Sequence, residues 1–293
     1  MHEFGRLTAK NGAPRFKNLV FTSAGDSSNI HNWLIGNRNF DLWTTYYGDK
    51  GDHLEAISDF YNRRKGGKFP NLHYAYRHWK DILDSYEAVM IMDDDIIIDA
   101  RGISRLFEIR ERFGLWLLQP AFSPLGRITI PITCARPFTM LRYTNFVEMT
   151  CPLILKSKLD EFMGIYDPAL SRFGVDWWIM EKMRPGKTAI VDEIVCINPH
   201  TVSKKEGVRE CARLQPDCVA AGTWNAIKSR HNIRSDEEGY RTLGLLAKEK
   251  ISTGDAAVLA LYLFFILKQI RAGLAGFFGM FKAKFFTKAD AVS

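Results

Sequence analysis

The sequence has few cysteines and none of the familiar cysteine motifs. Its five cysteines are Cys134, Cys151, Cys196, Cys211 and Cys218, and no two of them form a C-x-x-C pair. An odd number of cysteines without motif spacing favours reduced thiols over a disulfide scaffold. We therefore expect free thiols and a cytoplasmic location for the main body of the protein.

Long hydrophobic runs are also missing. Residues 1–17 are polar and contain no apolar core of a secretory signal. The run 256–267 has twelve apolar residues, too few for a helix to cross a bilayer. Zinc-finger, RNP-type and basic-zipper signatures are absent, so we do not expect nucleic acid as a partner, despite a formal net charge of +7. That charge favours other anionic partners, such as nucleotide phosphates, acidic glycans or anionic lipid.

What remains is the composition of an ordinary globular protein. Of the 293 residues, 46% are hydrophobic and 25% are charged, which excludes extensive disorder. Apolar runs predict strands at 18–22, 41–47, 87–92 and 115–118, and helices are predicted at 73–83 and 103–113 between them. This alternation indicates a mostly parallel sheet flanked by helices, a Rossmann-like α/β fold.

The second half of the sequence is less regular. We predict strands at 126–134 and 188–197, a helix at 157–165 capped by Ser157 and Asp160, and a helix at 175–183. Four segments follow from these patterns: a polar arm at 1–17, an α/β catalytic domain at 18–205, a polar extension of helix or loop at 206–255 and a basic, amphipathic helical tail at 256–293.

Three adjacent carboxylates, Asp93, Asp94 and Asp95, follow the predicted strand 87–92. Such neighbours repel one another and resist desolvation unless a cation compensates. Carboxylate oxygens suit Mg²⁺ or Mn²⁺. If the strand continued, Asp93 and Asp95 would share one side of it. The alternative is a solvated turn or a helix cap.

Other polar residues also follow predicted strands or turns. Asp26, in a Gly-Asp-Ser-Ser turn, is able to bind a base or ribose hydroxyl or to cap a helix. Because ligands of parallel sheets bind beyond the carboxyl ends of the strands, we expect Asp26 and the acidic run to face one site. Lys65 and Lys68, on a basic glycine turn, are able to meet a diphosphate or to form an ordinary surface loop.

Three further candidates lie in the second half. Asp176 stands beside two tryptophans, and apolar surroundings raise a carboxyl pKa towards that of a useful general base. Trp177 is able to stack on a sugar, although paired tryptophans commonly pack in a core. Glu148 is a polar insert in an apolar stretch that suits sugar or acceptor hydroxyls. His200 is either a metal or phosphate ligand or a structural histidine.

These pieces occur in an order that resembles a sparsely characterised family of GT-A-type glycosyltransferases. The resemblance covers residues 18–205, and its blocks are 20–28 (VFTSAGDSS), 65–71 (KGGKFPN), 92–95 (MDDD), 118–121 (LQPA), 141–148 (LRYTNFVE) and 173–176 (FGVD). It implies a GT-A fold in which Asp93 faces the donor ribose, Asp95 holds the metal and His200 completes the metal or diphosphate site. The chain departs from the family at Ser171–Asp176, where Gly-Trp-Gly-x-Asp is usual, and at 200–203, where His-Thr-Arg-Pro is usual.

The sequence therefore predicts a metal-dependent glycosyltransferase that uses a nucleotide-sugar donor. Asp26, Lys65, Lys68, Asp93 and Asp94 are expected at the donor, and Asp176 as base for a glycan or lipid-linked acceptor, with inversion favoured. The basic, Phe-rich tail suits an anionic membrane surface on the cytoplasmic side, or packing against the domain or a second copy. The alternatives are a metal-dependent phosphoryl or nucleotidyl transferase and a non-catalytic membrane-surface protein.

Overall fold

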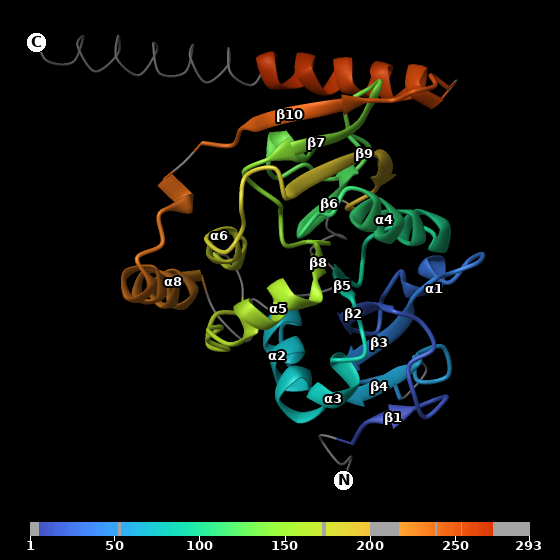
Figure 1. Cartoon of the computed structure of the whole chain (residues 1–293), viewed down its shortest axis with the longest axis vertical. Helices are drawn as coiled ribbons and strands as arrows, with labels where there is room; N and C mark the ends of the chain where they lie inside the picture. Colours follow the sequence, from blue (N-terminus) through green and yellow to red (C-terminus); the bar gives the residue numbers. More distant parts are fainter. Residues whose placement is uncertain are drawn as a thin grey trace, which may run out of the picture.

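The computed structural model describes residues 6–51, 54–171, 174–199, 217–237, 239–252 and 254–271. One ten-stranded sheet with helices on both faces contains all of its strands (Figure 1). The strands are β1 Thr8–Ala9, β2 Asn18–Ala24, β3 Asp41–Tyr46, β4 Phe60–Arg63, β5 Ala88–Asp93, β6 Leu117–Phe122, β7 Thr139–Thr144, β8 Leu153–Leu155, β9 Thr188–Cys196 and β10 Thr242–Ala247. The helices are α1 Ile30–Trp33, α2 Lys68–His78, α3 Lys80–Leu83, α4 Ala100–Arg112, α5 Lys156–Met163, α6 Val175–Met180 and α8 Asp217–His231, with short 3₁₀ turns at Pro131–Thr133 and Ser235–Glu237 and a last helix at 254–271.

The strands follow the order β1-β4-β3-β2-β5-β8-β6-β9-β7-β10 from one end of the sheet to the other. Strands β4, β3, β2 and β5 are parallel neighbours. Strand β8 is antiparallel to both β5 and β6, so β6 and its parallel partner β9 run in the same direction as β5. The predicted fold class, a mostly parallel α/β sheet flanked by helices, is confirmed.

Alternating side chains of the central strands enter two different cores. Val20 and Ala24 of β2 pack on the α1 and α4 side, together with Trp33 and Phe107. Leu19 and its alternate neighbours face α2, α5 and α6 instead. Strands that are buried on both faces read as continuous apolar runs, which is why this part of the sheet is visible in the sequence.

Strand β2 marks the point where the order of the strands reverses. The chain proceeds from β2 outwards through β3 and β4, then returns to place β5 on the opposite side of β2. In open α/β sheets, this reversal leaves room for a ligand beyond the carboxyl ends of the two strands. Here those ends are Ala24 and Asp93, and Ser23 pairs directly with Asp93 in the register.

Several local predictions are wrong. The helix expected at 73–83 is two helices, because the backbone leaves the helical region at Trp79. The strand expected at 126–134 is a loop with a 3₁₀ turn, since Gly126 packs tightly against the Asn198 backbone and Pro131 begins the turn. Helix α5 begins at Lys156 with Leu155 at its N-cap position, so Ser157 lies inside the helix and does not cap it.

The polar extension contributes a strand that the sequence did not reveal, and the tail begins with a helix, as predicted. Strand β10 pairs antiparallel with β7 at the edge of the sheet, and the helix 254–271 lies beyond it (Figure 1). Its Asp255 and Phe265 are buried, whereas Leu263, Phe264, Leu267 and Ile270 are more than half exposed. No helix among the described residues is long and apolar enough to cross a membrane.

Candidate functional site

The acidic run forms a turn at the end of β5, not an extension of the strand. Strand β5 ends at Asp93, so the expectation that Asp93 and Asp95 share one side of a strand is wrong. The three carboxylates point to different partners. Asp93 forms an ion pair with Lys68, at 2.7 Å between Oδ1 and Nζ. Asp94 turns towards β2, and Asp95 is partly buried beside it.

Asp94 joins the two strand ends. Its Oδ2 accepts a hydrogen bond from the Gly25 backbone N–H at 2.8 Å, immediately after β2. Burial, with the charges of Asp95 and Asp93, raises the pKa of Asp94 to about 7. A side chain at Gly25 would meet the Tyr47 ring at 2.8 Å, so glycine is what allows that ring to pack against the turn. The acidic run and the glycine turn therefore lie together, as predicted.

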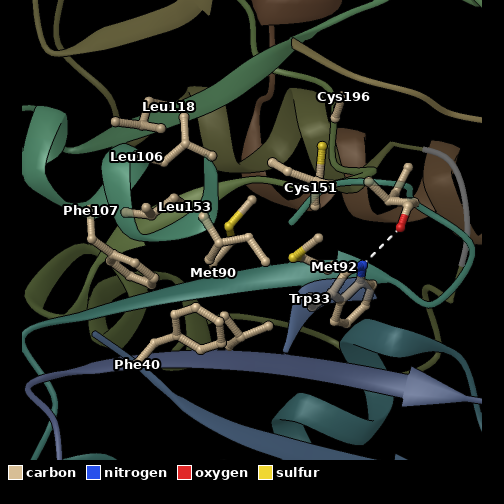
Figure 2. Packing of buried hydrophobic residues seen from close by; sticks show 14 of the residues in the cluster. Trp33, Phe40, Met90, Met92, Leu106, Phe107, Leu118, Cys151, Leu153 and Cys196 are labelled. Atoms are coloured by element: carbon tan, nitrogen blue, oxygen red, sulfur yellow. Dashed lines mark hydrogen bonds between the residues drawn. The ribbon is translucent and has the colours of Figure 1, made fainter. Parts of the chain in front are cut away.

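A second set of hydrogen bonds, from Asn29 and Trp33, fixes the backbone of the acidic turn. Asn29 donates its backbone N–H to the carbonyl of Asp94 at 2.7 Å and its side-chain amide to the carbonyl of Asp95 at 2.5 Å. The indole N–H of Trp33 donates to the carbonyl of Ile96 at 2.8 Å, and Figure 2 shows this bond together with the surrounding core. The start of α1 thus holds the backbone of the acidic run in place.

Asp26 organises the neighbouring loop. Its Oδ1 accepts bonds from the Tyr46 hydroxyl and from the backbone N–H groups of Asp49 and Lys50, the latter two at 3.1 Å. The Tyr46 bond is the main reason that the pKa of Asp26 is lowered. The helix-cap interpretation of Asp26 is wrong, because Asn29 occupies the N-cap position of α1.

The two candidate lysines differ in their surroundings. Lys68 opens α2 and is nearly buried, and its ammonium also donates to the carbonyls of Met149 and Thr150 at 2.6 and 2.9 Å. Lys65 is exposed and pairs with exposed Asp49 at 2.8 Å. We call Gly25, Asp26, Lys68 and the run Asp93–Asp95 the β2–β5 wall.

Glu148 adjoins this wall through Thr150. One carboxyl oxygen, Oε1, accepts the Thr150 hydroxyl at 2.9 Å, and the Glu148 backbone N–H donates to Gln119. The other oxygen, Oε2, is buried without a hydrogen-bond partner in the described part of the chain. Burial, with the charges of Asp176 and Asp93, raises the pKa of Glu148 to about 7. Asp176 and Asp93 are therefore both close enough to Glu148 for their charges to disfavour its ionised form.

Asp176 and Trp177 begin helix α6. Burial raises the pKa of the Asp176 carboxyl, whose Oδ1 accepts the N–H of Trp177 at 3.1 Å. The Trp177 ring stacks on Tyr240, with centroids 5.3 Å apart and planes 17° apart. We call Glu148, Asp176, Trp177 and Tyr240 the α6 wall. A protonated or poorly solvated carboxyl beside an aromatic surface suits proton transfer to or from a hydroxyl.

Sequence reasoning missed two residues of this site. Gln119 lies in a sequence block that was singled out, but without a role, and here its amide holds the Glu148 backbone. Tyr240 lies in the polar extension, where no pattern distinguishes it. His200 lies outside the described residues. A cavity of about 1060 Å³ beside α1 and α4 is lined by, among others, Ile35, Ile97 and Arg101, and by none of the candidate site residues.

The acidic turn offers only part of the ligand set that the predicted metal would need. Among the described residues, no three His, Cys, Asp or Glu side chains converge as a metal cluster. Mg²⁺ is often held by only one or two carboxylates, with phosphate oxygens and water completing its shell. Asp94 and Asp95 suit such a site, because the charge of Asp95 disfavours the ionised form of Asp94 and a cation would offset that repulsion. The residues present therefore fit a cation that is shared with a phosphate ligand.

Comparisons with known proteins give only distant likenesses. No protein-family model matches the chain, and no curated protein matches it. Among solved structures, S. aureus TarS 1–349 is 10% identical with a TM-score of 0.45. The match covers 68% of this chain and 63% of TarS 1–349, so this chain spans less than two thirds of that protein's length. The complex of TarS 1–349 with UDP is 11% identical with a TM-score of 0.42 over 74% and 72%. A197 from STIV is 14% identical with a TM-score of 0.35 over 61% and 83%. The fold class rests on the strand order and not on these scores.

Proposed function

We propose that this protein is a glycosyltransferase that moves a sugar from a nucleotide diphosphate donor to a hydroxyl acceptor. The observation that carries the proposal is the bond from the Gly25 N–H to the Asp94 carboxylate. It joins a glycine turn and an acidic turn at the point where the strand order reverses, which is where α/β sheets bind nucleotides. The α6 wall then adds carboxyl groups suited to an acceptor.

The β2–β5 wall is the proposed donor side. Asp26 and Asp93 would receive the nucleoside hydroxyls, and Lys65 lies on a loop able to approach the diphosphate. Lys68 would act mainly by fixing Asp93, since Asp93 and the carbonyls of Met149 and Thr150 already engage the three N–H donors of its ammonium. Asp95, with His200, would hold Mn²⁺ or Mg²⁺, which supplies Lewis-acid stabilisation of the departing diphosphate.

The α6 wall is the proposed acceptor side. Asp176 would accept the proton of the acceptor hydroxyl. The oxygen of that hydroxyl would form a bond to the anomeric carbon of the donor sugar as the bond from this carbon to the nucleoside diphosphate breaks. One such displacement inverts the anomeric centre. Glu148, with one unpaired oxygen, would bind a hydroxyl of the sugar or the acceptor. Its neutral form would donate and its ionised form would accept that hydrogen bond.

Two other functions make different predictions. A phosphoryl or nucleotidyl transferase would use the same acidic turn, but it would consume a nucleoside triphosphate. A non-catalytic membrane-surface protein would need only the tail, whose helix 254–271 exposes Leu263, Phe264, Leu267 and Ile270 beside Lys268 and Arg271. We favour the transferase because the unpaired oxygen of Glu148 and the stacked Trp177 and Tyr240 rings suit a hydroxyl-bearing acceptor, which neither alternative requires.

The test is a thermal-shift screen of the full chain with UDP, GDP, CMP, their sugars and the nucleoside triphosphates, with and without Mn²⁺. A ligand that binds only the native state raises the melting temperature. We expect a Mn²⁺-dependent shift with one nucleotide, lost in Asp95→Ala and kept in Asp81→Ala, which removes an exposed carboxylate on α3. A shift with triphosphates alone would favour the phosphotransferase, and no shift from a folded sample would overturn nucleotide binding.

Attachment to a membrane is a separate part of the proposal. The tail would hold the enzyme against anionic lipid on the cytoplasmic side, near a lipid-linked or envelope acceptor. Sedimentation with phosphatidylglycerol vesicles and with phosphatidylcholine vesicles tests it. We expect anionic vesicles to bind the chain and Phe264→Glu to weaken binding. Equal binding of both lipids would contradict an electrostatic contribution.

A further inference from the structure

Tyr240 is an aromatic residue that the chain brings to the α6 wall from a distant segment. Its ring stacks on Trp177 and meets the edge of Phe146 at 4.8 Å between centroids. It nevertheless remains 44% exposed, so part of its surface is open. The charges of both Asp176 and Glu148 act on its hydroxyl. An exposed ring thus stands next to the two carboxyl groups of the proposed acceptor side.

The segment that carries Tyr240 is fixed on both sides of it. Before Tyr240, Glu181 accepts the backbone N–H groups of Arg234 and Ser235 at 2.7 and 2.6 Å, and the Ser235 hydroxyl donates to the carbonyl of Trp177 at 2.6 Å. These bonds fasten the segment 232–237 along α6. Its position therefore depends on the same helix that carries Asp176.

The second attachment lies at the end of β7. Asn145 donates its side-chain amide to the carbonyl of Gly239 at 2.9 Å, and its side-chain oxygen accepts the N–H of Arg241 at 2.7 Å. Its own backbone N–H donates to the Arg241 carbonyl at 3.2 Å. Three bonds to one residue hold the two neighbours of Tyr240, so the ring is presented in a defined place and not on a free loop.

The chemistry of this surface indicates the ligand. An exposed tyrosine ring offers a flat apolar face and a polar hydroxyl, and carboxyl oxygens nearby offer hydrogen-bond acceptors. A sugar ring has the complementary form, with an apolar face of C–H groups and hydroxyls around its edge. A polyprenyl chain would gain nothing from the carboxyl groups, and a phosphate would be repelled by them.

We propose that Tyr240, supported by Trp177, is the platform on which the acceptor is held, and that this acceptor ends in a sugar ring. This inference rests on the proposed glycosyltransferase function. Tyr240 is a binding residue for the acceptor, whereas Asp176 remains the group that receives the proton. The polar extension at 206–255 therefore contributes to acceptor specificity as well as to the sheet.

The experiment compares transfer with hydrolysis of the donor. The full chain is given each nucleotide sugar with Mn²⁺, first in water and then with a panel of methyl glycosides, disaccharides, a serine-containing peptide and undecaprenyl phosphate, and nucleotide release is measured. We expect a saccharide to stimulate release. Tyr240→Ala should lower the ratio of transfer to hydrolysis roughly fivefold to tenfold and raise the acceptor KM, the size of a lost ring contact, while Tyr240→Phe should keep it.

A loosened segment is distinguished by a matched variant. Ser235→Ala removes the bond to the Trp177 carbonyl but leaves the Tyr240 ring in place, so it should keep most of the ratio. If Ser235→Ala and Tyr240→Phe lower the ratio of transfer to hydrolysis as far as Tyr240→Ala does, the Tyr240 ring is not the platform. Stimulation by the peptide or by undecaprenyl phosphate alone would also overturn the inference and leave the transferase standing. No nucleotide release from any donor would overturn the proposed function itself.

Discussion

The two walls of the candidate site treat their carboxyl groups in opposite ways. On the β2–β5 wall, Asp26 receives three hydrogen bonds and its pKa is lowered. On the α6 wall, one carboxyl oxygen of Glu148 has no partner among the described residues, and burial raises the pKa values of Glu148 and Asp176. Asp94 is the exception on the first wall, and it lies where a cation is expected. The charged form of Asp26 is thus favoured, whereas burial favours the protonated forms of Glu148 and Asp176.

The difference follows from the strands behind each wall. Parallel strands β2 and β5 end side by side, and their following turns expose backbone N–H groups that bind carboxylates. The α6 wall lies where the sheet becomes mixed, and its side chains come from a loop, a short helix and the distant segment 232–241. One carboxyl oxygen of Glu148 accepts the Thr150 hydroxyl and the other has no partner among the described residues, and burial is the largest influence on the pKa of both Glu148 and Asp176.

The largest expected effect on stability comes from breaking an ion pair in the mixed half of the sheet. Arg142 of β7 and Asp192 of β9 form a fully buried, two-pronged ion pair, with bonds of 2.7 and 2.9 Å. Asp192→Ala leaves the guanidinium buried without its counter-charge, which should lower the free energy of unfolding by about 3–5 kcal/mol. Urea unfolding measures this. Because an apolar pair often replaces a buried ion pair well, Arg142→Met with Asp192→Leu should recover part of the loss.

A second prediction concerns the α6 wall and pH. The pKa of Glu148 rises from 4.5 to about 7, a shift worth roughly 3 kcal/mol against the ionised form. Since the folded state holds this proton more tightly, the contribution of Glu148 to stability is greatest below pH 4.5 and is lost as pH rises through about 7. Glu148→Gln should therefore be more stable than the wild type at pH 8 and about equally stable at pH 4.

Activity separates this effect from simple repacking. Urea unfolding at both pH values gives the stability difference, and nucleotide release from the donor gives the function. We expect Glu148→Gln to gain stability at pH 8 while losing transfer, because a group kept for binding is commonly costly to the fold. Equal stability changes at pH 4 and pH 8 would show that Glu148 does not titrate as proposed.

A third prediction compares Lys68 of the first wall with Lys65, which lies on the exposed turn before it. Lys68→Met leaves Asp93 and the carbonyls of Met149 and Thr150 without their shared donor, which should cost about 1–3 kcal/mol. Lys65→Met removes only an exposed pair with Asp49 and should change stability by less than about 0.5 kcal/mol. Thermal melting of the two variants checks the contrast. Similar losses would mean that the burial of Lys68 contributes nothing.

The parallel half of the fold was readable because its strands are apolar on both faces and end in turn residues. The 18–22 and 87–92 runs became β2 and β5 nearly as predicted. Strand β4 contains Asn62 and Arg63, and β10 alternates exposed leucines with partly buried residues, so neither gives a continuous run. Their pairing is set by partners far away in the sequence, such as β7 for β10.

The site was predictable to a similar depth. The meeting of the glycine turn and the acidic run follows from parallel strands ending at one edge, and it is found. The sequence does not predict which of the three aspartates turns towards β2. That depends on where β5 ends and on the hydrogen bonds from Asn29 and Trp33 to the backbone of the turn. Tyr240 could not be found, because its place depends on bonds to Asn145 and Glu181.

The smallest expected effect tests the first wall with the opposite sign of pH dependence. Tyr46→Phe removes the hydroxyl that donates to Asp26, which should cost about 1 kcal/mol at pH 7. Because the folded pKa of Asp26 is lowered, its contribution is present above pH 3.8 and is lost as pH falls further. The cost of Tyr46→Phe, measured by urea unfolding, should therefore shrink at pH 3, whereas the gain of Glu148→Gln grows from pH 4 to pH 8. If both variants changed in the same direction with pH, the two walls would not differ in the way that their hydrogen bonds indicate.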